Sequence, residues 1–215
     1  MRSIRRLLAI VACAALALVP SRPLAAQDRP RASAGSALTA TLVAGGFVIV
    51  MRHASSPRTP PTADTAKPEN TALERQLDAA GEAGSTAMGD ALRALKIPIG
   101  EVLSSPTFRA RETVRAARLP NVDVIDALGD NGQSMQGVTE AQAAWLRARV
   151  AQTPRSGNTL IVTHQPNLAR AFPAWGGTVA DGECVVLKPD GRNGVELMGR
   201  IGIEDWPRTK APAPR

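Results

Sequence analysis

The sequence has 215 residues, 44% of them hydrophobic and 21% charged, which suits one α/β domain and excludes a fibrous or wholly disordered chain. Two Cys and two His exclude a disulfide framework and leave little for a zinc site. The formal charge of +7 suggests a nucleic-acid partner, but four arginines and no acids lie in residues 1–26; beyond them, 22 basic side chains face 19 acidic ones. Because the remaining chain is only mildly basic, nucleic acid is not an expected partner.

Residues 1–26 have the three parts of a secretory signal. Three arginines within Met1–Arg6 precede an uninterrupted apolar run, Leu7–Val19, and Ala25 and Ala26 provide small residues for cleavage. The run is too short to span a bilayer comfortably, so we expect no stable membrane anchor after cleavage. The expected location is a bacterial periplasm or the exterior. Lipidation of Cys13 is a minor alternative, because this residue lies inside the apolar run rather than after it.

Short apolar runs alternate with amphipathic segments along the rest of the chain. Residues 27–41 are predicted to be a flexible lead-in, residues 42–205 the folded domain and residues 206–215 a flexible tail. Strands are predicted at 46–51, 101–104, 121–125, 158–163, 184–187 and 195–203. Helices are predicted at 78–96, from Pro106 to about 118, and at 139–152, where Thr139 is the N-cap. This alternation predicts a three-layer α/β/α sandwich with a largely parallel central sheet.

Charged side chains follow the predicted buried strands. Arg52 and His53 come directly after the strand at 46–51, and His164 follows the strand at 158–163. Arg109 lies about one helical turn beyond the strand at 101–104. Ligands of open α/β sheets bind at the carboxyl ends of the strands, so these side chains converge if the strands are neighbours. Two His and two Arg repel metal cations and favour a doubly charged anion, so the residues predict a phosphate site.

The same residues resemble the motifs of the histidine phosphatase superfamily, which includes cofactor-dependent phosphoglycerate mutases and bacterial phosphohistidine phosphatases. The matching motifs are Arg52-His53-Ala54, the block from Leu103 to Thr113 with Ser104-Ser105-Pro106 and Arg109-Ala110, and Val162-Thr163-His164. The resemblance covers residues 46–203. Ala54 stands where the family has Gly, a small change that should leave the loop intact.

The resemblance implies a role for each of these four residues. His53 is the expected nucleophile that attacks phosphorus and becomes a phosphohistidine, which water then hydrolyses. Arg52 and Arg109 are expected to clamp the phosphoryl oxygens, and His164 to donate to the same oxygens as an imidazolium. No metal and no organic cofactor is implied, and the expected partner is a small phosphorylated substrate.

The general acid stays open between two carboxyl groups. Many members of the family carry an acid in a Leu-x-Glu pattern, for which Leu128-Gly129-Asp130 is the nearest match here. Glu183, at the start of a late strand, is the second candidate for protonating the leaving oxygen. Some family members that act on phosphohistidine have no acid at the middle position. A third alternative is therefore that no side chain protonates the leaving group.

Other residues are interpreted as structural. Arg58 and Arg75 are expected at the surface, and Cys184 in a buried strand. Two functions from different classes remain: an exported phosphatase acting on a phosphomonoester or phosphoramidate, and a non-catalytic anion-binding module. A mutase is the third and weakest option. The sequence names neither the substrate nor the oligomeric state.

Overall fold

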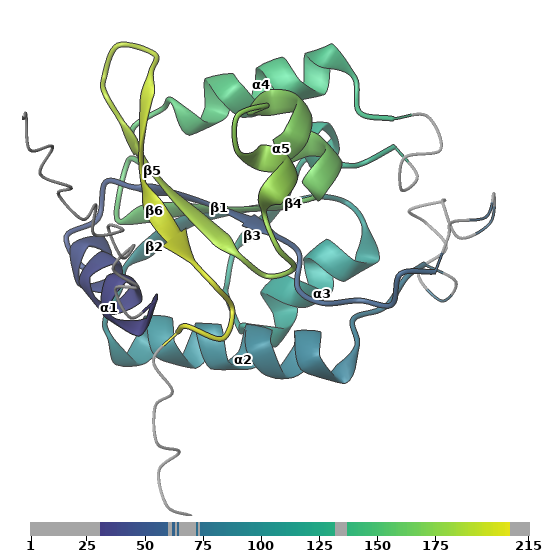
Figure 1. The fold of residues 1–215 in the computed structure, drawn as a ribbon, viewed down its shortest axis with the longest axis horizontal. Helices are drawn as coiled ribbons and strands as arrows, with labels where there is room; N and C mark the ends of the chain where they lie inside the picture. The colour runs from purple at the N-terminus through teal and green to yellow at the C-terminus, as the bar shows by residue number, and fades with distance from the viewer. Residues whose placement is uncertain are drawn as a thin grey trace, which may run out of the picture.

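Six strands form one sheet at the centre of the computed structural model, which describes residues 31–59, 62, 64, 72, 74–131 and 137–206 (Figure 1). The strands are β1 (Val48–Arg52), β2 (Ile99–Ser104), β3 (Val122–Val124), β4 (Asn158–Thr163), β5 (Cys184–Pro189) and β6 (Val195–Ile201). Their order across the sheet is β3-β2-β4-β1-β5-β6. Neighbours among the first four are parallel, whereas β5 is antiparallel to both β1 and β6. The predicted, largely parallel sheet is confirmed.

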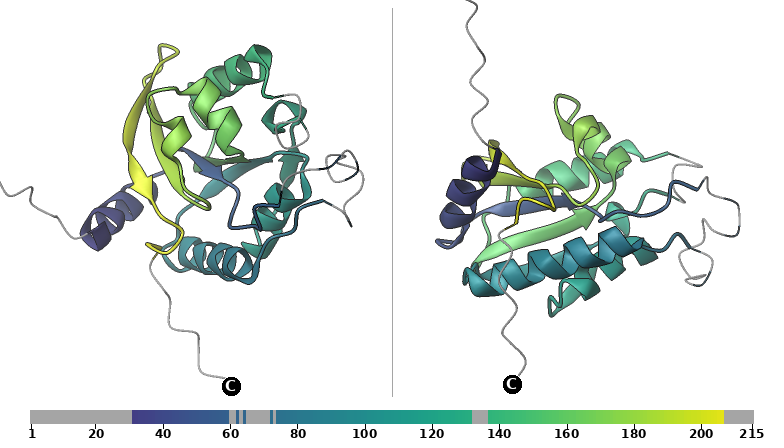
Figure 2. Two further views of the ribbon diagram at one scale, coloured as in Figure 1. Left: turned by 45° about the vertical axis from the view of Figure 1, so that its right-hand side comes forward. Right: turned by 60° about the horizontal axis from the view of Figure 1, so that its bottom comes forward.

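Helices cover both faces of the sheet, which confirms the predicted three layers (Figure 2). One face packs against α2 (Ala79–Ala94) and α3 (Phe108–Ala116), and the other against α4 (Glu140–Val150) and α5 (Gln165–Ala171). A further helix, α1 (Arg31–Leu42), lies beside β6. Two short 3-10 helices, η1 (Asp126–Leu128) and η2 (Gly176–Thr178), complete the described elements.

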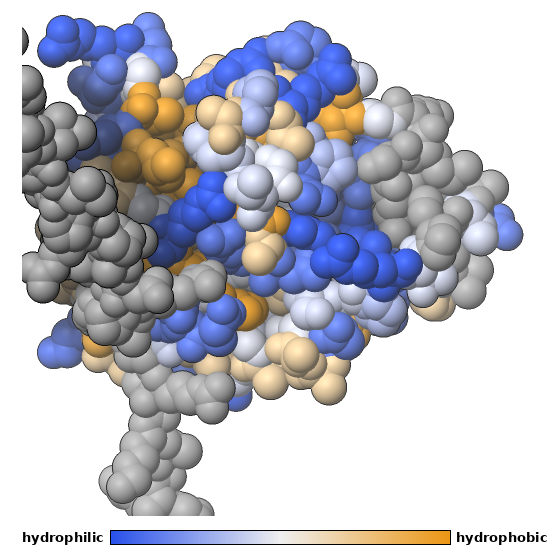
Figure 3. All heavy atoms as spheres, in the orientation of Figure 1, coloured by the Kyte–Doolittle hydropathy of each residue, from blue (hydrophilic) through white to orange (hydrophobic). Residues whose placement is uncertain are grey.

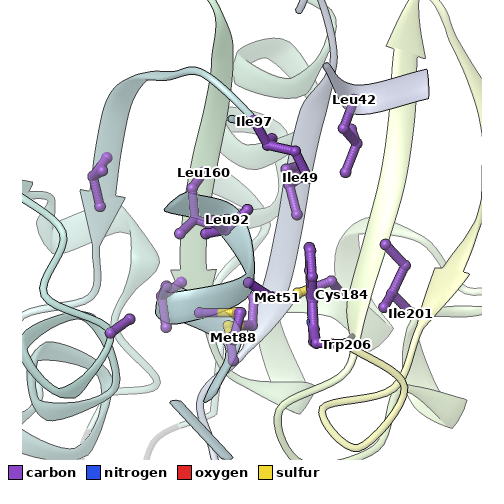
Figure 4. Close-up of a cluster of buried hydrophobic side chains, with 14 of the residues drawn as sticks. Leu42, Ile49, Met51, Met88, Leu92, Ile97, Leu160, Cys184, Ile201 and Trp206 are labelled. Atoms are coloured by element: carbon purple, nitrogen blue, oxygen red, sulfur yellow. The ribbon is translucent and has the colours of Figure 1, made fainter. Parts of the chain in front are cut away.

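Both central strands are buried on their two faces. In β1, Ile49 and Met51 point into the cluster beneath α2 and α3, which Figure 4 shows, while Val48 and Val50 belong to the cluster beneath α4 and α5. β4 is buried along its whole length and alternates in the same way. A strand that contributes to two cores needs apolar side chains at consecutive positions, which explains the continuous apolar runs in the sequence.

Side-chain caps define where two of the helices begin. Thr139 is the N-cap of α4, as predicted, and forms a capping box with Gln142. The Nε2 group of Gln142 also donates to the carbonyl oxygen of Gly129 (2.8 Å), which ties α4 to the loop carrying Asp130. Asp78 is the N-cap of α2 and accepts a hydrogen bond from the backbone N–H of Gly81 (2.8 Å). Loops on both sides of the molecule are thereby fixed to helix ends.

The predicted boundaries of the folded domain are wrong at both ends. Residues 31–42, expected to be flexible, form α1, because alanine favours helix and the buried Leu42 anchors the helix in the core. Trp206, placed in the flexible tail, is 2% exposed and packs beside Cys184 (Figure 4). Burial raises the pKa of the Cys184 thiol to about 12, as expected for a cysteine inside a strand. The predicted signal and residues 207–215 lie outside the described residues.

The surface shown in Figure 3 carries its hydrophobic side chains in small patches among hydrophilic ones. Large exposed hydrophobic residues of the described chain include Leu197 and Met198 of the edge strand β6. Within the described ranges, no helix is both long and apolar enough to cross a membrane.

Candidate active site

The carboxyl ends of three adjacent strands bring the predicted residues together. His53 follows β1, His164 follows β4 and Ser105 follows β2, with β4 between the other two strands. The backbone N–H of His53 donates to the carbonyl oxygen of Thr163 (2.9 Å), and that of Ser105 donates to Val162 (2.9 Å). The ring centroids of His53 and His164 are 5.2 Å apart. The three strands β2, β4 and β1 are therefore neighbours, as the predicted phosphate site requires.

The ring of His53 is held in one tautomer. Its Nδ1 lies 2.8 Å from the carbonyl oxygen of Ala54, which can only accept, so Nδ1 carries the proton. Its Nε2 accepts from the Nε–H of Arg109 at 3.2 Å, so a lone pair lies on Nε2. The side chain is 2% exposed, and burial lowers the pKa of His53 well below its usual value, assisted by the charge of Arg109. His53 is a neutral imidazole with its Nε2 lone pair directed into the site.

His164 is neutral as well, which corrects the expectation of an imidazolium. Its Nδ1 lies 3.0 Å from Nη2 of Arg109, and because a guanidinium only donates, Nδ1 must accept. Its Nε2 then carries the proton and donates to Oγ of Ser105 at 2.8 Å. Burial, followed by the charge of Arg109, lowers the pKa of His164 well below its usual value. In this arrangement the single N–H of the ring is used by Ser105.

Arg109 connects both histidines. Its side chain is 1% exposed and bonds His53 through Nε, and both His164 and the carboxylate of Asp130 through Nη2. The remaining nitrogen, Nη1, is buried and has no hydrogen-bond partner among the described residues. Burial lowers the pKa of Arg109, although Asp130 opposes this effect. One guanidinium therefore orients both rings and keeps an unused donor.

Arg52 has its terminal nitrogens committed to the loop before β5. Its Nη1 donates to the carbonyl oxygen of Val179 (3.0 Å), and its Nη2 pairs with Asp181 at 2.5 Å. Its Nε is buried and has no partner among the described residues. Burial lowers the pKa of Arg52, whereas the carboxylate of Asp181 opposes the shift. The loop before β5 therefore holds the Arg52 side chain in place.

Three arginines near the histidines have a buried nitrogen without a partner in the described part of the chain: Arg52 Nε, Arg75 Nε and Arg109 Nη1. Their charges repel one another, since Arg75 lowers the pKa of Arg52 and Arg109 lowers that of Arg75. Unsatisfied buried donors cost free energy, and like charges add to that cost. An anion with several acceptor oxygens relieves both. Within the part of the chain that the structure describes, no group of three or more His, Cys, Asp or Glu side chains is suited to hold a metal ion.

The two carboxyl groups predicted as acids have different surroundings. Asp130 lies inside the site, bonded to Arg109, with its Oδ2 3.7 Å from Nδ1 of His164. Glu183 instead accepts from the backbone N–H of Ala180 (2.8 Å) and faces Arg200 at 3.7 Å. Its carboxylate closes the turn before β5, and none of these contacts involves the two histidines.

Several solved structures share this architecture. The protein histidine phosphatase SixA, complexed with tungstate, matches with a TM-score of 0.55 and 18% identity over 74% of this chain and 98% of its own. Bacillus stearothermophilus YhfR matches at 0.51 and 17% over 70% and 94%. A phosphoserine phosphatase mutant from Entamoeba histolytica, in complex with phosphoserine, matches at 0.50 and 10% over 74% and 98%. The chain has the histidine phosphatase fold. No protein-family model and no curated protein matches the sequence.

On this histidine phosphatase fold, the segment before α2 supplies two residues that the sequence interpretation missed. Arg75 is half-buried, contrary to its predicted surface position, and its charge lowers the pKa of both His53 and His164. Glu74 is 4% exposed and accepts a hydrogen bond from the backbone N–H of Phe108, the first residue of α3. Arg58, by contrast, is exposed as expected.

A contact between two loops of the histidine phosphatase fold explains these positions. Asp78 accepts from Oγ of Ser55 (2.7 Å), and its backbone N–H donates to the carbonyl oxygen of Ser55 (3.1 Å). Gly81 permits this approach, because a Cβ atom there would lie 2.2 Å from that same oxygen. The signal of this contact in the sequence is Asp78, the N-cap residue, followed three residues later by Gly81. The contact fastens the start of α2 to Ser55, two residues after His53.

Proposed function

We propose that the protein is a phosphatase that forms a phosphohistidine on His53. The observation that carries this proposal is the neutral His53, whose Nε2 lone pair faces Arg109, one of three arginines of the site with a buried donor that has no partner among the described residues. A nucleophilic imidazole must be unprotonated at the attacking nitrogen, with its other nitrogen held by a hydrogen bond. A phosphate dianion has the acceptor oxygens that the arginines lack.

Substrate binding and nucleophile release are one event in this mechanism. In the structure, the Nε–H of Arg109 bonds the lone pair of His53 Nε2. A phosphoryl oxygen takes over that donor, and the lone pair becomes free to attack phosphorus. The leaving oxygen departs, water attacks the phosphohistidine, and the Nε2 lone pair is restored. Fixed positive charge around the transferring group supplies most of the rate acceleration.

Two structural neighbours support an oxyanion as the ligand. SixA was solved with tungstate, and the phosphoserine phosphatase mutant from Entamoeba histolytica with phosphoserine. We propose a phosphomonoester or phosphoramidate as the substrate of this chain, hydrolysed without a metal, since clustered arginines repel cations.

The test is phosphate release from p-nitrophenyl phosphate by the full chain in EDTA, beside His53→Ala. We expect turnover in the wild type and a loss of at least about a thousandfold in the variant, because the nucleophile is absent. Both proteins are checked for folding by circular dichroism and for vanadate binding. Wild-type-like turnover in His53→Ala contradicts the mechanism. Vanadate binding without turnover of any phosphate ester or phosphoramidate indicates an anion-binding module instead.

We also propose that the protein is exported, with cleavage after Ala26. The support is the arginine-rich start followed by the apolar run Leu7–Val19. Mass spectrometry of the chain recovered from a periplasmic fraction should give an N-terminus at Gln27. A chain found only in the cytoplasm with residues 1–26 intact contradicts export.

A further inference from the structure

A second carboxyl group, that of Glu74, lies beside Arg109 and comes from a different segment of the chain than Asp130. Asp130 reaches the guanidinium from the loop after η1, whereas Glu74 comes from the segment before α2. The backbone N–H of Phe108 fixes the carboxyl group of Glu74 at the residue adjacent to Arg109. Glu74 is 4% exposed, so its carboxyl group is withdrawn from bulk water.

The two carboxyl groups differ in their partners. Asp130 forms the ion pair with Arg109 and also faces His164, whereas Glu74 has a backbone N–H as its fixed partner. Burial raises the pKa of Glu74, and the charge of Asp130 raises it further, although Phe108 and Arg109 oppose these effects. Paired carboxyl groups whose environments differ in this way divide into a carboxylate and a proton carrier.

We propose that Glu74 is the general acid of the reaction and protonates the leaving oxygen. This inference rests on the proposed phosphatase function. Asp130 is then the carboxylate that holds Arg109 and faces His164, and Glu183 closes the turn before β5. Glu74 acts on substrate directly and belongs to neither of the positions at which the sequence predicted an acid.

The proton moves in a closed cycle. The lone pair of His53 Nε2 forms the N–P bond while the bond from phosphorus to the leaving oxygen breaks. The carboxyl proton of Glu74 passes to that oxygen, which leaves as an alcohol, and Glu74 becomes a carboxylate. Glu74 then takes a proton from the water that attacks phosphorus. The N–P bond breaks, phosphate departs, and both side chains return to their starting states.

Leaving groups of different basicity test this role. p-Nitrophenolate leaves readily without a proton, whereas phenolate needs one. Glu74→Gln keeps an oxygen that accepts from the Phe108 N–H but has no proton to give. We expect kcat for phenyl phosphate to fall by about a hundredfold or more, and kcat for p-nitrophenyl phosphate by less than about tenfold. The alkaline limb of the pH profile for phenyl phosphate should also disappear.

Two further variants separate chemistry from structure. Glu74→Asp retains a proton donor and should restore part of the lost phenyl phosphate activity. Glu82→Gln, at an exposed position in the first turn of α2, should leave both substrates unaffected. An equal loss with both substrates, or no loss with either, overturns the assignment while the phosphatase function stands. Wild-type protein that hydrolyses no phosphate ester or phosphoramidate, or full activity in His53→Ala, overturns the proposed function and this inference together. Turnover of phosphoramidates alone overturns this inference and leaves the phosphatase function standing.

Discussion

Arg109 determines the protonation state of both histidines because a guanidinium can only donate hydrogen bonds. It bonds Nε2 of His53 and Nδ1 of His164, so each ring must present a lone pair to it. The site is therefore arranged before substrate arrives, with two neutral rings and one carboxylate around a single cation. Such prior arrangement avoids reorganisation during the reaction.

Arg75 is predicted to contribute to anion binding. Its Nε is buried and has no partner in the described part of the chain, so bulk water does not compete with an anion for this donor. A charge-assisted hydrogen bond contributes about 1.5–3 kcal/mol, so Arg75→Gln should weaken binding of inorganic phosphate by about tenfold or more. Isothermal titration calorimetry measures this. Arg115→Gln, a residue 69% exposed and paired with Glu112, is the control, and an unchanged Kd in Arg75→Gln contradicts the role.

The sequence could predict residues that follow strands but not those placed by contacts between loops. His53 and His164 follow strands whose apolar runs are visible in the sequence, so their convergence could be inferred. Glu74 and Arg75 depend on the contact between Ser55 and Asp78, which are 23 positions apart. Neither hydrophobic periodicity nor the family motifs used above report such a contact.

Among the helices, those with a side-chain N-cap were predicted from the sequence, whereas α1 and α5 were missed. α2 and α4 begin at Asp78 and Thr139, whose side chains cap the backbone, and both were expected. α5 was missed because it spans only seven residues and gives too little sequence for a helical period. α1 was missed because its alanine-rich segment resembles a linker in composition, while its anchoring depends on the distant partners of Leu42.

The start of α2 is predicted to be sensitive to a single methyl group. In Gly81→Ala the added Cβ would lie 2.2 Å from the carbonyl oxygen of Ser55, so the helix must move away from the loop after His53. We expect a loss of about 1–3 kcal/mol in the free energy of unfolding, measured in urea, together with reduced kcat. Gly177→Ala is the matched control, because its nearest contact is 3.8 Å away. Equal effects of the two substitutions would show that the close approach is unimportant.

The two buried neutral histidines couple the stability of the entire fold to pH. Their pKa values are lowered in the folded state, so below about pH 6.5 the unfolded chain binds protons that the folded chain does not. The free energy of unfolding should therefore be retained at neutral pH and fall on acidification, by up to about 1.4 kcal/mol per pH unit for each histidine. Urea unfolding at pH 7.5, 6.5 and 5.5 measures the slope.

The comparison with a double variant isolates this contribution. His53→Asn combined with His164→Asn removes both titrating rings, so its stability should decline less steeply than that of the wild type over the same pH range. Effects of carboxyl groups act on both proteins and largely cancel in the difference. Parallel slopes would mean that the histidines do not take up protons on unfolding.

The position of β4 has a consequence for when the protein can first act. β4 joins the sheet between β1 and β2, although it follows both in the chain, and Val48 pairs with Thr159 across more than a hundred residues. Contacts of such sequence separation form late, because a long loop must close first. Before that insertion His164 cannot lie beside His53, and Arg109 lacks one of its three partners. A partly synthesised chain ending before residue 158 therefore lacks the assembled site, and the proposed activity can begin only after β4 has joined the sheet.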